Sequence, residues 1–156
     1  MNLVIKRVQS YDNKALEKIH ESMKKTLRKI YVPIETNKTN CINNIFEDEV
    51  IIAEVNDVAV GTVRIKVVND RLHLIGLGVI EDFRNLGIGK AIIQYSKKLA
   101  SDKNLKYLSL YTIKETGNID LFKKFGFKLV HQEKTDAFIG VSCDVLHEVY
   151  MELDIP

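Results

Sequence analysis

Residues 79–91 read VIEDFRNLGIGKA, and in this stretch an apolar strand runs into a turn that carries Gly87 and Gly89 and then opens a helix. Such a turn leaves the first backbone N–H groups of the helix without internal acceptors, and the positive end of the helix dipole adds to their field. Together these groups form a binding site for an anion, most often a phosphate. The stretch therefore predicts a phosphate-binding loop between a strand and a helix.

Two common phosphate motifs do not fit this loop. A Walker A loop has the pattern GxxxxGK[ST], but Arg84 stands five residues before Gly89, and Ala91 replaces the Ser or Thr that binds magnesium. A dinucleotide fingerprint GxGxxG that begins at Gly76 requires a glycine at position 81, where the chain has Glu81. The sequence therefore argues against a nucleotide-binding protein of either kind.

A third pattern, [Q/R]-x-x-G-x-[G/A], is matched by Arg84-Asn85-Leu86-Gly87-Ile88-Gly89. It resembles the pyrophosphate-binding signature of the GNAT (Gcn5-related) N-acetyltransferase family, whose ligand is acetyl-CoA. A second stretch, NIDLFKKFGF at residues 118–127, is similar to the family pattern N-x-x-[LF]-Y-x-x-x-G-F. The resemblance covers about residues 3–153. It implies an acetyl-CoA-dependent N-acetyltransferase in which a primary amine of a small molecule or a peptide attacks the thioester directly.

The hydropathy pattern around both motifs predicts a mixed α/β domain. Asn56-Asp57 and Asn69-Asp70 suit tight turns, so they join three strands into an antiparallel meander. The order β-α-β-β-β-α-β-α-β-β is that of a single-domain GNAT-like fold over residues 1–156, with a mixed, mostly antiparallel sheet flanked by helices. The expected strands are 3–8, 50–55, 58–68, 72–80, 105–111, 127–133 and 145–153. The first expected helix is capped by Asp12 or Ser10 and has apolar positions from Leu16 to Ile30; the others are 87–100 and 117–125. Residues 31–47 and 134–144 are expected to be irregular.

Composition limits the class of protein. The chain has 156 residues, 46% of them hydrophobic and 28% charged, with a formal net charge of +2, values that exclude wholesale disorder and favour neither nucleic acid nor an anionic membrane as partner. The N-terminal residues lack the apolar stretch of a signal peptide, and two cysteines make no disulfide framework. We therefore expect a cytoplasmic protein with no metal site.

The resemblance assigns acetyl-CoA contacts to both motifs. In the family, the strand before the loop pairs with the pantetheine arm through its backbone, and the N–H groups of the loop hold the pyrophosphate. Asn118 corresponds to the residue that hydrogen-bonds the pantetheine amide; it can also cap the helix 117–125, and the two roles are compatible. The expected contacts are Leu77, Gly78, Val79, Arg84, Asn85, Leu86, Gly87, Ile88, Gly89, Lys90, Asn118 and Phe122.

His73 is the predicted general base. It lies six residues before Val79, on the strand where some relatives carry a glutamate or a histidine, and a two-residue period would place His73, Ile75, Leu77 and Val79 on one face. An imidazole can take the proton of the attacking amine directly or through a water molecule. Alternatively, His73 pairs across the hairpin and has a structural role. The family further implies that a backbone N–H, that of Val79 or Leu77, stabilises the oxyanion.

The general acid is the point at which the chain departs from the family. The usual tyrosine is Phe122, which has no hydroxyl to protonate the leaving thiolate. Tyr111, at the end of strand 105–111, can take this role, and so can water. The departure also motivates an alternative function, a catalytically weak acyl-CoA-binding regulatory module.

Specificity for the acceptor amine is expected in residues 27–47 and 134–144, by analogy with the family. Their acidic residues can attract a cationic amine, or they are ordinary solvated charges. A homodimer through residues 145–153 is a further analogy with the family. The acidic residues in question are Glu35, Glu47, Asp48 and Asp136.

Overall fold

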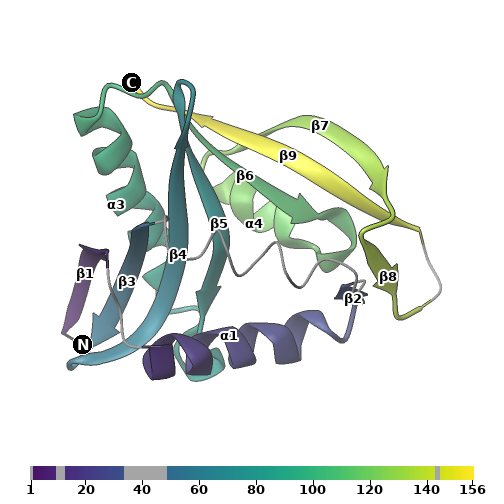
Figure 1. Ribbon diagram of the computed structural model, residues 1–156, viewed down its shortest axis with the longest axis horizontal. Helices are drawn as coiled ribbons and strands as arrows, with labels where there is room; N and C mark the ends of the chain where they lie inside the picture. Colours follow the sequence, from purple (N-terminus) through teal and green to yellow (C-terminus); the bar gives the residue numbers. More distant parts are fainter. Residues whose placement is uncertain (1, 10–12, 34–48, 143–144) are drawn as a thin grey trace.

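A seven-stranded sheet forms the centre of the computed structural model, which describes residues 2–9, 13–33, 49–142 and 145–156 (Figure 1). The strand order is β1-β3-β4-β5-β6-β9-β7. Among the strands that the structure describes in this sheet, only β5 and β6 run parallel, so the expected mixed, mostly antiparallel sheet is confirmed. The strands are β1 Leu3–Val8, β3 Glu49–Val55, β4 Val58–Val68, β5 Arg71–Val79, β6 Tyr107–Ile113, β7 Lys128–Thr135 and β9 Leu146–Asp154.

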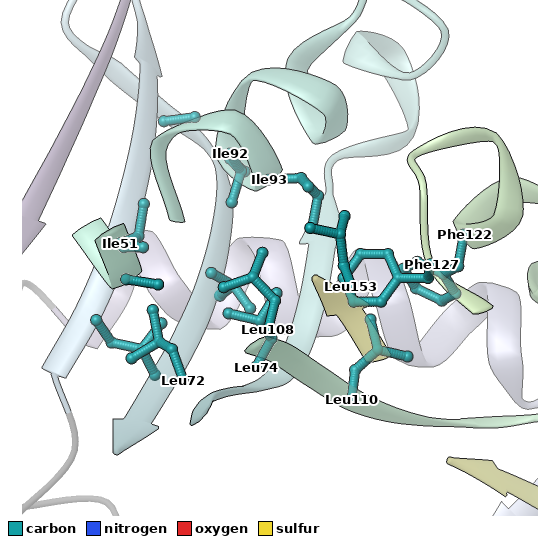
Figure 2. Packing of buried hydrophobic residues seen from close by; sticks show 14 of the residues in the cluster. Ile51, Leu72, Leu74, Ile92, Ile93, Leu108, Leu110, Phe122, Phe127 and Leu153 are labelled. Carbon is teal, nitrogen blue, oxygen red and sulfur yellow. The ribbon is translucent and has the colours of Figure 1, made fainter. Parts of the chain in front are cut away.

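Within the described ranges, three helices flank the sheet and divide between its two faces. Alternating side chains of β3 show the division: Ile51 and Ala53 belong to the large core with α3 and α4, whereas Val50 and Ile52 pack under α1. Figure 2 shows that core, in which Ile92 and Ile93 of α3 lie beside the apolar side chains of the central strands. The helices are α1 Asn13–Leu27, α3 Ile88–Asp102 and α4 Asn118–Lys124, with 3-10 turns at Glu81–Phe83 and Lys114–Thr116.

The two predicted tight turns are present. Asn56 and Asp57 have φ of 50° and 67° between β3 and β4, and Asn69 has φ of 53° between β4 and β5. Asparagine and aspartate tolerate this left-handed region better than most other residues, so these turns follow from the local sequence.

A second, two-stranded sheet was not expected. Strands β2 (Tyr31–Pro33) and β8 (Phe138–Gly140) pair antiparallel, and the ring centroids of Tyr31 and Phe138 lie 4.8 Å apart. The prediction that both segments are irregular is therefore wrong at these positions. Each strand has three residues, and its partner lies more than a hundred residues away along the chain. A local hydropathy pattern therefore cannot predict this pairing.

Gly78 of β5 is in close contact with α1. A Cβ built on Gly78 would lie 1.9 Å from Sδ and 2.4 Å from Cγ of Met23, so the helix rests on the bare backbone here. We expect Gly78→Ala to cost about 1–3 kcal/mol of stability, because Met23 must leave its rotamer or α1 must shift. Urea unfolding measures the loss, and Gly89→Ala, where the nearest atom lies 3.9 Å away, is the matched control.

A double-mutant cycle tests the cause of that loss. With Met23→Ala in the background, Gly78→Ala is expected to cost much less, because the clashing side chain is gone. Equal costs in the two backgrounds would show that the Met23 contact is not the reason for the glycine.

Candidate active site

β5 and β6 separate halfway along their length. Their parallel pairing runs from Arg71↔Tyr107 to Leu74↔Leu110 and then stops. Beyond that point, within the described residues, the β5 backbone groups that face β6 have no strand partner. An extended ligand can therefore hydrogen-bond there as an additional strand would.

A bulge on β5 coincides with this separation. Arg64 of β4 pairs with Ile75, and Thr62 pairs with Gly78. Between these two pairs β5 advances by three residues and β4 by two, so β5 contains one extra residue. Gly76 has φ of 67° in this segment, a conformation that glycine adopts without strain. The bulge turns the end of β5 away from the regular sheet.

The bulge corrects one expectation about β5. His73 pairs with Lys66 and Val79 pairs with Gly61, and these partners are five positions apart on β4, so they point to opposite faces. A Cβ on Gly61 would meet Ile92 of α3 at 3.2 Å, which places Val79 on the α3 face. The prediction that Val79 shares a face with His73 is therefore wrong, because the extra residue shifts the alternation.

A pocket of about 230 Å³ lies where the two strands separate. Four of the predicted site residues line it: Leu77 of β5, Tyr111 of β6, and Asn118 and Phe122 of α4. The pocket has walls from both sides of the sheet, since Phe122 belongs to the core on the α3 face and Met23 comes from α1. The pocket is therefore bordered by residues from both faces of the sheet.

Three further lining residues lie outside the two sequence motifs. Tyr31 and Phe138, from the unexpected sheet, supply aromatic walls, and Glu148 of β9 supplies a carboxylate. Glu148 is the cross-strand partner of Ile113 on β6. Tyr31 and Phe138 lie in segments 27–47 and 134–144, where acceptor specificity is expected by analogy with the family, whereas nothing in the sequence pattern of β9 marks Glu148.

The loop at residues 84–90 leads into the N-terminus of α3. Gly87 is the N-cap of α3 with φ of 85°, and it gives no side-chain hydrogen bond to the first N–H groups of the helix. Asn85 is also left-handed, with φ of 62°, and together with Leu86 and Lys90 it is exposed, whereas Ile88 anchors the helix in the core. The N–H groups at this helix end are therefore presented outward.

Arg84 shapes the loop rather than pointing into it. Its Nε donates to the Val79 carbonyl at 2.9 Å, its Nη1 donates to Thr26 Oγ1 at 2.9 Å, and its Nη2 donates to the Ser22 carbonyl at 3.4 Å. These bonds tie the end of β5 to α1 and fix where the loop begins.

The remaining predicted contacts lie around the pocket rather than in its walls. Gly78, Val79 and residues 84–90 are not among the lining residues; they continue along β5 from the pocket to the N-terminus of α3. Asn118 is the first residue of α4, whose N-cap is Gly117 with φ of 79°. The prediction that Asn118 caps this helix is therefore wrong, and its side chain is available to the pocket.

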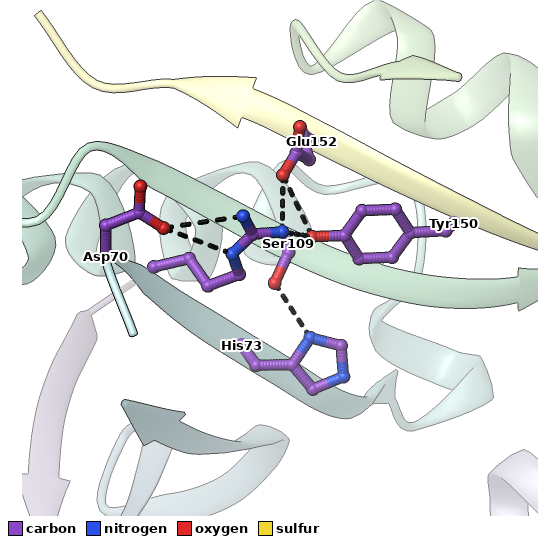
Figure 3. Close-up of polar contacts among 6 residues, drawn as sticks. Asp70, His73, Ser109, Tyr150 and Glu152 are labelled. Carbon is purple, nitrogen blue, oxygen red and sulfur yellow. Dashed lines mark hydrogen bonds and ion pairs between the residues drawn. The ribbon is translucent and has the colours of Figure 1, made fainter. Parts of the chain in front are cut away.

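His73 lies beside the pocket, next to Tyr111. The two ring centroids are 5.3 Å apart, and His73 Nδ1 is 2.8 Å from Ser109 Oγ (Figure 3). Burial lowers the pKa of His73, and the positive charges of Arg71 and Lys66 lower it further. The imidazole is therefore neutral at pH 7 and able to accept a proton.

The acidic residues expected to attract the acceptor contribute little to this site. Glu35, Glu47 and Asp48 lie outside the described residues, and Asp136 is exposed and does not line the pocket. In the described part of the chain, no group of three His, Cys, Asp or Glu side chains is placed to hold a metal ion. Nor does that part contain a helix long and apolar enough to cross a membrane.

Residues 15–127 match the family model described as the acetyltransferase (GNAT) family, which is more than half of the chain. The chain belongs to the GNAT acetyltransferase family. The split strands, the loop before α3 and the helix α4 are therefore elements of a GNAT fold.

Relatives agree with this assignment. The chain is 30% identical over 113 residues to the probable N-acetyltransferase san of Drosophila melanogaster, an alignment that covers 68% of this chain and 61% of that protein. It is 26% identical over 123 residues to N-alpha-acetyltransferase 50 of Danio rerio, with 70% of each chain covered.

Solved structures show the same fold. A putative streptothricin acetyltransferase from Bacillus anthracis, crystallised with acetyl coenzyme A, superposes over the full length of both chains with a TM-score of 0.72 at 17% identity.

Proposed function

We propose that the protein transfers the acetyl group of acetyl-CoA to a primary amine of a small molecule or a peptide, by direct attack of the amine on the thioester. The observation that carries the proposal is the pocket between β5 and β6, which is bordered by residues from both faces of the sheet and lies next to the part of β5 that leads to the N-terminal loop of α3. This arrangement offers one side to the cofactor and the other to the acceptor.

Acetyl-CoA fits the cofactor side. Its pyrophosphate would accept hydrogen bonds from the N–H groups after Arg84, and its pantetheine arm would pair with the free backbone edge of β5. Asn118 would hydrogen-bond the pantetheine amide, and Phe122 would pack beside the thioester. The acetyl-CoA complex of the Bacillus anthracis relative supports this choice of ligand.

His73 would accept the proton of the substrate ammonium, through a water molecule beside Tyr111. In the reaction the amine nitrogen forms a bond to the acetyl carbon, and the bond from that carbon to the CoA sulfur breaks. The N–H of Leu77, which lines the pocket, would donate to the oxyanion that forms between these steps.

The acceptor side of the pocket favours an amine that carries an apolar group next to its nitrogen. Tyr31, Phe138 and Leu27 give apolar walls, and Glu148 gives one carboxylate for one ammonium group. Both a peptide amino terminus, in keeping with the name of the Danio rerio relative, and a small amine satisfy these walls. A polyamine or an aminoglycoside would need additional acidic partners.

An amine panel with thiol detection tests the proposal. Polyamines, aminoglycosides, amino acids and peptides with apolar first residues are offered with acetyl-CoA, and release of CoA thiol is followed. Turnover with an apolar amine is expected. Saturable acetyl-CoA binding without turnover on any amine would instead support the alternative, a regulatory acyl-CoA-binding module.

Tyr111 is proposed as the general acid in place of the missing family tyrosine. It lines the pocket and is 57% exposed, so its hydroxyl can reach a ligand. Tyr111→Phe is expected to lower kcat about tenfold, with the dissociation constant of acetyl-CoA unchanged, because only proton delivery to the thiolate is removed.

Phe122→Tyr is the rescue variant. It restores the hydroxyl at the family position, so kcat of the double variant Tyr111→Phe/Phe122→Tyr is expected to recover most of the loss. If Tyr111→Phe leaves kcat unchanged in single-turnover experiments, water rather than Tyr111 delivers the proton.

A further inference from the structure

Strand β9 extends beyond the point at which β6 leaves the sheet (Figure 1). The last pair between the two strands is Ile113↔Glu148, after which the chain forms the 3-10 turn Lys114–Thr116. Leu146 and His147 therefore keep β7 as a neighbour, but within the described residues they have no strand partner on the β6 side. A backbone N–H that faces this side needs another acceptor.

The side chain of Glu115, in the 3-10 turn, supplies that acceptor. Its Oε1 accepts the backbone N–H of His147, and its Oε2 lies 3.3 Å from His147 Nδ1. An ionised carboxylate has no proton to give, so both hydrogen bonds run from His147 to Glu115. The two side chains are only 24% and 26% exposed, which limits competition from water. We call Glu115 with its two hydrogen bonds to His147 the Glu115 clamp.

Each end of the Glu115 clamp is joined to a wall of the pocket. On the side of the turn, Thr116 Oγ1 accepts the N–H of Asn118 at 3.2 Å and so connects the turn to the start of α4. On the side of the strand, Glu148 directly follows His147. Thr116, Asn118 and Glu148 all line the pocket. The clamp therefore fixes the backbone of Glu148 relative to the wall at the start of α4.

We propose that Glu115 is a positioning residue, which holds Glu148 where its carboxylate brings the ammonium group of the acceptor to the thioester. The inference rests on the proposed function, in which Glu148 attracts the amine, and adds what keeps that carboxylate in place. Displacement of a bound reactant by about 1 Å can lower a rate about 100-fold, so the placement of Glu148 matters for the reaction.

The position of Glu148 at the end of the β6–β9 ladder explains why a side chain is needed there. On the C-terminal side of Glu148, β9 lies between β6 and β7 and is held by both. On its N-terminal side, among the described residues, β7 and the Glu115 clamp are what hold the strand. Without the clamp, this end of β9 would have a backbone partner on one side only.

Hydrogen exchange of the His147 amide tests the contact without any substrate. We expect this amide to exchange about tenfold more slowly in the wild type than in Glu115→Ala, the equivalent of one hydrogen bond. Glu115→Gln should keep most of the protection, because its amide oxygen still accepts the N–H. Equal exchange rates in the wild type and in Glu115→Ala would overturn the proposal.

Kinetics test the positioning role. Glu115→Ala is expected to raise KM for the amine about tenfold and to change the dissociation constant of acetyl-CoA little, because the loop before α3 and the β5 edge are untouched. Glu115→Gln should restore most of the affinity for the amine. A loss of acetyl-CoA affinity with an unchanged KM for the amine would overturn the proposal, since the clamp would then act on the cofactor.

A double-mutant cycle separates positioning from general stabilisation. In the Glu148→Gln background, Glu115→Ala should have little further effect on KM, because the carboxylate that it positions is gone. Equal effects in the two backgrounds would overturn the proposal. Glu54→Ala is the matched control: it removes a partly buried carboxylate that pairs with Lys6 at the opposite edge of the sheet, and it should leave KM unchanged.

Failure of this inference differs from failure of the proposed function. If the wild type turns over an amine and Glu115→Ala has the same KM, the positioning role is refuted and the proposed function stands. If no amine reacts with acetyl-CoA, the proposed function and the positioning role fail together, whereas exchange of the His147 amide still reports whether the contact exists.

Discussion

His73→Ala is expected to lower kcat/KM for the acceptor amine by about 100-fold or more at pH 7, while the dissociation constant of acetyl-CoA changes little. The imidazole stands beside Tyr111 at the edge of the pocket, and it is outside the loop and the β5 edge that would hold the cofactor. Its loss should therefore affect the proton transfer and spare binding. Stopped-flow thiol release and calorimetry measure the two quantities separately.

The pH profile gives the same base a distinct signature. Burial, Arg71 and Lys66 lower the pKa of His73 below its ordinary value of about 6.5, so the neutral base prevails at pH 7 and is lost only as the pH falls through that lowered pKa. The wild-type rate should thus be flat near neutrality and fall on the acidic side. His73→Ala should lack this acidic limb.

Glu148→Gln is the matched control for both measurements. Glu148 lines the pocket and is the other group that could receive a proton, but we propose that it attracts the ammonium group. Its loss should raise KM for the amine and leave the acidic limb in place. If Glu148→Gln removes the limb and His73→Ala does not, the carboxylate is the base.

What the sequence could predict here is local. The loop of residues 84–89 and the start of α4 are short contiguous segments. Each helix begins after a glycine with positive φ, so the sequence motif alone was enough to locate both segments. The antiparallel meander followed in the same way from Asn56-Asp57 and Asn69-Asp70, whose turns need residues that tolerate positive φ.

What the sequence could not predict depends on distant partners. The bulge on β5 exists only relative to β4, and without it the alternation from His73 to Val79 is read wrongly. The wall formed by Tyr31 and Phe138 needs two short strands from opposite ends of the chain, and the ion pair of Arg71 with Glu152 joins residues about eighty positions apart. No period of two or 3.6 residues encodes such contacts.

Gly87→Val should weaken acetyl-CoA binding about 10- to 100-fold, because a β-branched residue is strained by about 1–2 kcal/mol per residue in the left-handed region and the loop must rearrange to relieve it. Gly87 has φ of 85° and no atom within 4 Å of its missing Cβ, so the expected effect comes from the backbone and not from a clash. Displaced N–H groups would then lose their bonds to the pyrophosphate. Calorimetric titration with acetyl-CoA measures the change.

Two glycines separate loop geometry from general strain. Gly89 has no positive φ, its Cβ position makes only an ordinary contact with Phe125 at 3.9 Å, and the family pattern allows alanine there, so Gly89→Ala should bind acetyl-CoA as the wild type does. Gly126 follows α4 and also has positive φ, 106°, so Gly126→Val introduces comparable backbone strain away from the loop. This variant should lower the melting temperature and leave the affinity for acetyl-CoA unchanged. If Gly87→Val binds acetyl-CoA as tightly as the wild type, the N-terminus of α3 is not the binding site of the pyrophosphate.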